Sequence, residues 1–225
     1  MRPASFTVAA LMMAAAGLAP VLAQKTVKTI PVVPQAAPSP SHAERATLYV
    51  EDPNDPRGRS MAGSVVWESE TISRYGAKEP VYSTKELVIT GRAEIPQRQL
   101  SMVLTLRHNT DRSLPASHTV DLLFKLPPEA PSDAILNVPG ILMKQGENER
   151  GDLLAGLAGK VTTGFFLIGL SPEQGERDGN VAMLKERPWI EIPIVFTDNL
   201  RGLLALEKGA TGNEAFAQTF AEWEK

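Results

Sequence analysis

Two histidines bracket a polar stretch in the middle of the chain, His108 before it and His118 after it. If the apolar segments beside them pair as strands, the two imidazoles lie close together at one end of a sheet. Asp111 and Asp121 are near in the sequence, and two histidines with a carboxylate can bind zinc. Residues 108–121 are therefore a candidate metal- or small-ligand-binding region, with His108, His118, Asp111 and Asp121 as the metal ligands. Their spacing matches no metal signature, so solvated loop residues are the competing interpretation.

A second segment rich in oxygen side chains is residues 51–58, with the sequence EDPNDPRG. Calcium takes six to eight oxygen ligands, and such a loop can supply several of them. Its two prolines interrupt the spacing of an EF-hand loop, and Asp-Pro and Pro-x-Gly steps are typical of turns. The segment therefore predicts a turn, with calcium binding as the alternative.

Enzymatic chemistry has little support in the sequence. The 225-residue chain contains no cysteine, which excludes a thiol nucleophile, a disulfide and Cys-ligated zinc. No G-x-S-x-G motif or phosphate-binding glycine loop is present. Glu68 and Glu70 share one face of a predicted strand, so an acid pair hydrolysing envelope polymers is a further hypothesis. We expect no enzymatic activity and no cofactor.

Two long polar stretches, residues 108–118 and 144–152, are predicted to be exposed loops that contact other molecules. The candidate contact residues are Asn109, Asp111, Arg112, Glu147, Glu149 and Arg150. The net charge of −3 and the scattered basic residues argue against a nucleic-acid partner. The expected partner is an envelope protein or surface.

The N-terminus has the pattern of an export signal. Arg2 precedes an apolar run over residues 6–23, which ends in Val21-Leu22-Ala23. We expect cleavage near Ala23-Gln24 and a periplasmic or secreted protein. The alternative is an uncleaved membrane anchor, which would be the chain's only membrane contact. Residues 24–43 contain four prolines and predict an extended spacer.

From residue 44 to residue 225 the pattern is that of strands and turns. Apolar residues alternate with polar ones over 100–107 and 119–126, which predicts two half-buried strands. The further predicted strands are 46–51, 63–72, 86–93, 136–143, 160–170, 189–196 and 203–207. Two short helices are expected, at 181–187 after an Asn180 cap and at 214–224 after an Asn213 cap.

These elements predict a mainly β fold. We expect a single β-sandwich-like domain of two packed sheets. Its last element is an amphipathic C-terminal helix, because Phe216, Phe220 and Trp223 fall on one helical face.

The stretch LMKQ…AGLAGKVTTGFFLIGLS…NVAMLKERPWIEIPIVF resembles small exported proteins of alphaproteobacteria. Its order of elements over residues 100–223 is also similar to the invasion-associated locus B-like family. That family places cysteines around a Gly-aromatic step, here Gly164-Phe165, whereas this chain has none. The resemblance implies an exported β-sandwich that contacts other molecules, and it transfers no catalytic residue.

Taken together, these patterns predict an exported, non-enzymatic β protein that acts by protein or envelope contact. A metal- or small-ligand-binding module at residues 108–121 is the alternative, and a hydrolase of envelope polymers has the least support.

Overall fold

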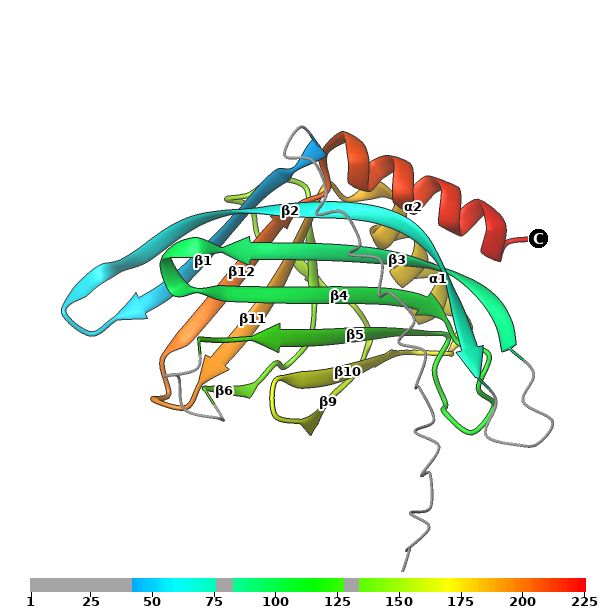
Figure 1. Ribbon diagram of the computed structural model, residues 1–225, viewed down its shortest axis with the longest axis horizontal. Helices are drawn as coiled ribbons and strands as arrows, with labels where there is room; N and C mark the ends of the chain where they lie inside the picture. Colours follow the sequence, from blue (N-terminus) through cyan, green and yellow to red (C-terminus); the bar gives the residue numbers. More distant parts are fainter. Residues whose placement is uncertain (1–41, 76–82, 128–133) are drawn as a thin grey trace, which may run out of the picture. The chain divides into compact units, whose positions relative to one another are not determined.

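The computed structural model describes residues 42–75, 83–127 and 134–225, and Figure 1 shows how their elements are arranged. The strands are β1 (Glu44–Asp52), β2 (Asp55–Tyr75), β3 (Ser83–Ile95), β4 (Leu100–His108), β5 (His118–Lys125), β6 (Ile135–Asn137), β7 (Leu142–Lys144), β8 (Asp152–Leu153), β9 (Gly156–Thr162), β10 (Phe165–Leu170), β11 (Trp189–Phe196) and β12 (Arg201–Glu207). The α-helices are α1 (Gln174–Glu186) and α2 (Gly209–Trp223). The predicted mainly β domain with a C-terminal helix is confirmed.

Within the described residues, one antiparallel sheet of twelve strands replaces the two sheets expected from the sequence. Its order is β8-β7-β11-β12-β1-β2-β3-β4-β5-β10-β9, with β6 beside β11. The reason lies in β2, whose 21 residues pair with β1 as far as Val65 and with β3 from Ser64 onward. One long twisted strand thus carries the sheet from one half into the other, and the sheet curls instead of dividing (Figure 1).

The two ends of the sheet are joined through a short link. Strands β8 and β9 are terminal in the sheet but consecutive in the chain, with only Leu154 and Ala155 between them. The Leu154 N–H donates to the carbonyl of Ile141 at 2.9 Å, and the Ser171 N–H donates to the carbonyl of Ala155 at 2.9 Å. The link is therefore held to both ends of the sheet.

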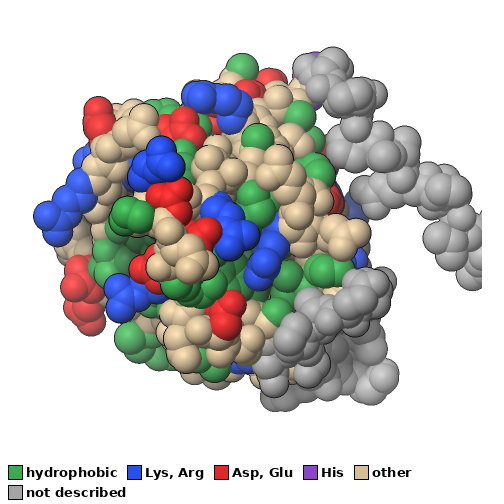
Figure 2. Space-filling view, turned by 90° about the vertical axis from the view of Figure 1, so that its left-hand side faces the viewer, with side chains coloured by type: hydrophobic (Ala, Val, Ile, Leu, Met, Phe, Trp, Pro, Cys, Tyr) green, Lys and Arg blue, Asp and Glu red, His purple; other side chains and the backbone are tan. Residues whose placement is uncertain are grey.

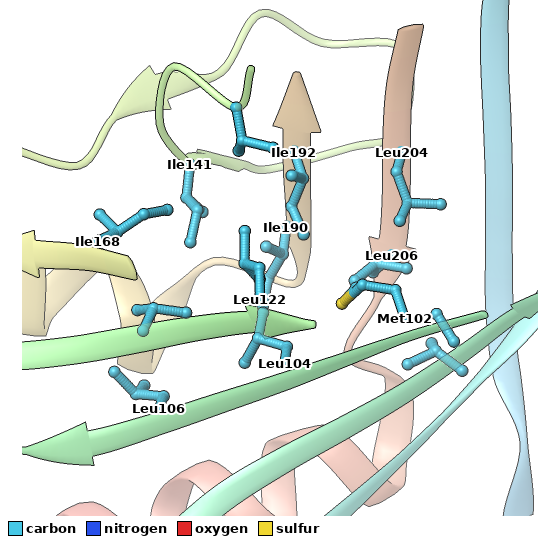
Figure 3. Packing of buried hydrophobic residues seen from close by; sticks show 14 of the residues in the cluster. Met102, Leu104, Leu106, Leu122, Ile141, Ile168, Ile190, Ile192, Leu204 and Leu206 are labelled. Carbon is cyan, nitrogen blue, oxygen red and sulfur yellow. The ribbon is translucent and has the colours of Figure 1, made fainter. Parts of the chain in front are cut away.

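The core lies inside this curl and follows the alternation in the sequence. On β4, the side chains of Leu100, Met102, Leu104 and Leu106 are at most 2 % exposed. Figure 3 shows side chains from the two halves of the sheet pointing toward one another, and the cluster includes Leu104, Leu106, Leu122, Ile168, Ile190, Ile192, Leu204 and Leu206. Period-two patterning thus correctly identified the buried face of the central strands.

Both helices begin earlier than expected, because the predicted caps have other roles. Asn180 lies inside α1 and is 1 % exposed. Its side-chain oxygen accepts from the Ala155 N–H and its amide donates to the Ala155 carbonyl, both at 2.8 Å. The predicted cap therefore fixes the link between β8 and β9. Asn213 likewise lies within α2, which starts at Gly209.

A buried lysine connects the two helices. The Lys208 ammonium donates to the carbonyls of Leu184 and Lys185 at the end of α1, at 2.9 and 3.2 Å. It also lies 4.4 Å from the ring centroid of Phe216 on α2. Burial lowers the pKa of Lys208 to about 8. The positive charge is placed where the carbonyl dipoles of α1 stabilise it.

Two predicted strands are each divided in the structure. Residues 136–143 form parts of β6 and β7, separated around the Pro-Gly step. Residues 160–170 form a hairpin of β9 and β10 that turns at Gly164. Gly164 has φ +70°, and a Cβ there would lie 2.7 Å from the Phe124 carbonyl oxygen. Glycine is therefore required at this turn.

The predicted signal peptide (1–23) and all but the last two residues of the predicted spacer (24–43) lie outside the described residues. Among the residues that the structure describes, no helix is both long and apolar enough to cross a membrane.

Candidate functional site

The two histidines meet at the end of the β4–β5 pair. His108 and His118 are directly opposite one another in the register, and their ring centroids are 5.3 Å apart with the rings edge to face. His108 is exposed, whereas His118 is 5 % exposed. The end of α2 covers His118, with the rings of Phe220 and Trp223 at 6.0 and 5.4 Å.

The environment of His118 favours the neutral imidazole. Burial lowers its pKa to about 4, and the charges of His108 and Arg177 act in the same direction. Its Nδ1 lies 3.2 Å from the Ser117 hydroxyl, which can donate or accept according to the tautomer. At neutral pH His118 is thus an uncharged ring buried against aromatic side chains, and His108 is the exposed member of the pair.

Asp111 and Asp121, the two aspartates predicted as metal ligands, do not form a metal site with His108 and His118. Asp121 is on the opposite face of β5 from His118, because three positions along a strand reverse the side-chain direction. Its carboxylate accepts from Arg107 at 2.8 Å. Asp111 accepts from the N–H and hydroxyl of Ser113 at 2.9 and 2.7 Å. In the part of the chain that the structure describes, no three His, Asp or Glu side chains could together hold a metal ion.

A cavity of about 380 Å³ opens beside His108. It lies between the start of β3, the end of β4 and the end of α2, and its lining includes Lys85, Glu222 and Trp223. An imidazole, an ammonium, a carboxylate and an indole ring are thus available to a small polar molecule. Of the predicted small-ligand region at residues 108–121, His108 and Thr110 line this cavity.

The loop after β4 is organised by its own polar residues. The Asn109 amide donates to the carbonyls of Asp111, Leu114 and Ala116 at 3.1, 3.0 and 2.8 Å. Its oxygen accepts from the Asp111 N–H at 3.0 Å. Asn109, predicted as a contact residue, therefore builds the loop, while Asp111 and Arg112 are exposed.

The second predicted contact loop is bound to β1 through Glu147. The Glu147 carboxylate accepts from Thr47, Tyr49 and Arg45 at 3.1, 2.9 and 3.3 Å. Burial, followed by the hydrogen bond to Glu147, raises the pKa of Tyr49. Glu147 therefore fixes the loop, whereas Glu149 and Arg150 are exposed.

The same loop covers a buried ion pair that sequence reasoning missed. The Lys144 ammonium lies 2.8 Å from the Glu191 carboxylate, and the two residues are 6 % and 8 % exposed. The ammonium also donates to the Glu147 carbonyl at 2.5 Å. The residues are 47 positions apart, and only the pairing of β7 with β11 brings them together.

The acid pair on β2 is held by a single guanidinium. Arg92 lies 2.6 Å from the Glu68 carboxylate and 2.6 Å from that of Glu70. Burial, followed by the hydrogen bond with Glu70, raises the pKa of Glu68. One cation between two acids is the arrangement of a structural ion cluster, with the acids side by side on one strand.

The segment 51–58 forms the tip of the β1–β2 hairpin. The Asp52 carboxylate accepts from Arg59 at 2.7 Å and from the Asn54 N–H at 3.0 Å. Asp55 accepts two bonds from the Arg57 guanidinium, each of 3.1 Å. Arginine and backbone groups thus occupy the oxygens that the calcium alternative required, as expected for a turn.

Exposed aliphatic side chains gather on the last strands of the sheet. Leu157 on β9 is 84 % exposed, Val161 on β9 is 52 % exposed and Leu123 on β5 is 42 % exposed. Sequence reasoning missed this feature because residues 156–162 were not recognised as a separate strand. The pair of glycines at 156 and 159 and the Gly164 turn were the available signs of an edge strand.

Comparison with known proteins found no matching family model, no similar curated protein and no similar solved structure. The resemblance to the invasion-associated locus B-like family stays a prediction.

Proposed function

We propose that this protein is an exported, non-enzymatic β protein that acts by binding another protein of the cell envelope. The observation that carries the proposal is an exposed apolar area on β5, β10 and β9. It consists of Leu123, Leu157, Phe165 and Leu167, and we call it the apolar face. Contiguous exposed apolar areas on soluble domains are typical of interaction sites.

The strand register places these side chains together. Phe166 and Ile168 of β10 point into the core, so Phe165 and Leu167 point outward and are half-buried. Phe165 is directly opposite Leu123 on β5.

The register on the other side of β10 extends the apolar face onto β9. Leu167 is opposite Gly159, and Gly169 is opposite Leu157. Each of these leucines therefore faces a glycine on the neighbouring strand, and no side chain covers it from that position. A Cβ at Gly159 would meet no atom within 4 Å, so a partner's side chain has room there.

The chemistry of this area favours a protein over a small ligand. It is an open sheet surface, and each fully buried leucine contributes roughly 2 kcal/mol of binding free energy. Two such anchors with half-buried neighbours are the composition of a small interface core. The exported location rests on the N-terminal pattern of residues 1–23.

The test compares two double variants of the full chain with the unmodified protein. Leu123→Asp with Leu157→Asp places two charges on the apolar face, and Leu136→Asp with Leu153→Asp is the matched control, since these two leucines are 47 % and 60 % exposed on β6 and β8. We expect binding to washed envelopes of the source cell to fall about tenfold or more in the double variant. The control should bind as the unmodified protein does.

Equal binding by all three proteins would overturn the proposal, as would binding that survives protease treatment of the envelopes. Melting curves confirm that each variant is folded. A photoreactive residue at position 157 should cross-link to one defined protein, and the same residue at position 153 should not.

A second candidate function is that of a small-ligand-binding module at the cavity beside His108. The observation that favours it is the convergence of His108, Lys85, Glu222 and Trp223 on that cavity of about 380 Å³. A bound ligand would raise the melting temperature and change the fluorescence of Trp223. His108→Ala should abolish both responses.

A further inference from the structure

A groove of about 560 Å³ lies between the β1–β2 hairpin and the turn from β11 to β12. It is lined by residues 49–53, 55–59 and 200–203, and we call it the hairpin groove. Figure 2 faces this end of the molecule, where basic, acidic and apolar side chains are interspersed on the surface. The groove shares no residue with the apolar face or with the cavity beside His108.

The walls of the hairpin groove include an apolar strip. Tyr49 on β1 is directly opposite Leu203 on β12, and Leu203 is 39 % exposed. Leu200 and Val50, which pack against the core, and Pro53 extend the strip. An aliphatic chain or an aromatic ring can therefore be sheltered here from water.

The guanidinium groups of Arg57, Arg59 and Arg201 border this strip. The guanidinium of Arg201 makes no hydrogen bond or ion pair with the described residues, since only its backbone N–H is bonded, to Glu51. Among the described residues, Arg59 bonds to Asp52 through its Nε alone, and its side chain is 69 % exposed. Both arginines therefore have N–H donors left for a ligand, in the forked geometry that suits carboxylate and phosphate.

The three acids of the groove already accept hydrogen bonds from groups of the protein itself. Glu51 accepts from the Arg201 N–H at 2.9 Å, while Asp52 and Asp55 are bonded to arginine and backbone donors. The hydrogen bond from Arg59 lowers the pKa of Asp52, and that from Arg57 lowers the pKa of Asp55. Asp52 and Asp55 therefore stay ionised and orient the guanidinium groups of Arg59 and Arg57.

The β1–β2 hairpin contains a bulge beside the groove. The register shifts between Val50 and Asp52, and Gly58 on the facing strand has φ +66°. A Cβ at Gly58 would lie 2.7 Å from the Val50 carbonyl oxygen. A bulge with glycine opposite it redirects the hairpin tip and positions Arg57 and Arg59 at the groove.

We propose that the hairpin groove binds an anion with an apolar body, that is, a carboxylate or phosphate monoester joined to an aliphatic or aromatic group. The anionic end pairs with Arg201 and Arg59. The apolar body lies along Tyr49, Leu203 and Leu200. This site is independent of the envelope contact proposed above.

The test uses the full chain and anilinonaphthalene sulfonate, a fluorescent anion with an apolar body. Arg201→Gln removes a guanidinium without described side-chain contacts, and Arg59→Gln is added in a double variant. The control is Arg112→Gln with Arg150→Gln, which lowers the net charge equally at two exposed loop arginines. We expect binding about tenfold weaker or more in the double groove variant and within twofold in the control.

Competition experiments test the contributions of the anionic group and of the apolar body separately. Decanoate and decyl phosphate, which have apolar chains of nearly equal length, should displace the probe, and the stronger competitor identifies the preferred anion. Decanol, which lacks the charge, and inorganic phosphate, which lacks the apolar body, should displace it weakly. Equal displacement by decanol and decanoate would overturn the proposal, as would equal affinity in all the arginine variants. Loss of probe binding on Leu123→Asp with Leu157→Asp would instead assign the probe to the apolar face.

Discussion

Strands β4 and β9 lie three positions apart in one antiparallel sheet, yet they are stabilised in different ways. β4 pairs with β3 and β5, and every second side chain from Leu100 to Leu106 is buried. Among the described strands, β9 pairs with β10 alone, and six of its seven residues are exposed. Hydrophobic burial specifies β4, whereas backbone pairing and a tight turn specify β9. The difference separates the residues that maintain the fold from those free to contact other molecules.

The sharpest test of this difference is one substitution made in both strands. Leu104→Asp places a charge on the inner face of β4, where Leu104 is 2 % exposed, and should destabilise the domain by about 4 kcal/mol or more. Leu157→Asp on β9 should change the free energy of unfolding by about 0.5 kcal/mol or less. Urea denaturation measures both values, and similar losses would mean that β9 is also part of the core.

The stability of the domain should also depend on pH through His118, which lies at the start of β5 opposite the end of β4. Below pH 6.5 the unfolded chain takes up a proton at His118, whereas the folded domain takes it up only near its pKa of about 4. The free energy of unfolding should therefore fall by roughly 3 kcal/mol as the pH decreases through this window. Above pH 6.5 His118 is neutral in both states and contributes no pH dependence.

Denaturation at a series of pH values measures this effect. His118→Phe keeps an aromatic ring beneath Phe220 and Trp223 and should flatten the profile between pH 6.5 and 4. If the free energy of unfolding of the variant falls between pH 6.5 and 4 as much as that of the unmodified protein, the acid response belongs to other groups.

The turn of the β9–β10 hairpin offers a matched pair of glycines. Gly164→Ala forces a side chain into a positive φ and toward the Phe124 carbonyl, and should cost about 2 kcal/mol. Gly159→Ala places a methyl group in open space on the same hairpin and should be neutral or slightly stabilising. Thermal denaturation of the two variants should differ accordingly, and equal melting temperatures would contradict the turn geometry.

A small effect on stability is expected at Lys160, which lies on the edge strand β9. Its ammonium donates to the Ile135 carbonyl at 3.3 Å, and a lysine on an edge strand discourages pairing with another sheet. Lys160→Val should change the free energy of unfolding by about 0.5 kcal/mol and increase self-association. Sedimentation over a range of concentrations measures the association, and a variant that associates no more than the unmodified protein would place the protection elsewhere, for example in the bulge at Val161.

The fold was predictable where one face of a strand is buried. Alternation located the strands over 100–107, 119–126 and 189–196, because a half-buried strand repeats every two residues. It failed over 160–170, where residues of both faces of β9 are exposed and the pattern continued into β10. Helix starts failed for a different reason, since the amide of Asn180 serves a distant loop instead of its own helix.

The candidate sites were predictable only in part. The proximity of His108 and His118 follows from one hairpin, which neighbouring segments can specify. The placement of Asp121 on the other face of β5 also follows from side-chain alternation, and the sequence contained the information to exclude it as a partner of His118. The hairpin groove was not predictable, because Arg201 reaches it from a strand about 150 residues away.

By itself, the sequence determined which face of the half-buried central strands is apolar and that the described domain is mainly β, because side-chain direction alternates along a strand and aliphatic groups leave water. Only the tertiary structure decided which strands are neighbours and therefore which polar groups meet. Arg45, Thr47 and Tyr49 surround Glu147 across 98 to 102 positions of sequence. Such contacts depend on the order of strands in the curled sheet, which local propensity does not encode.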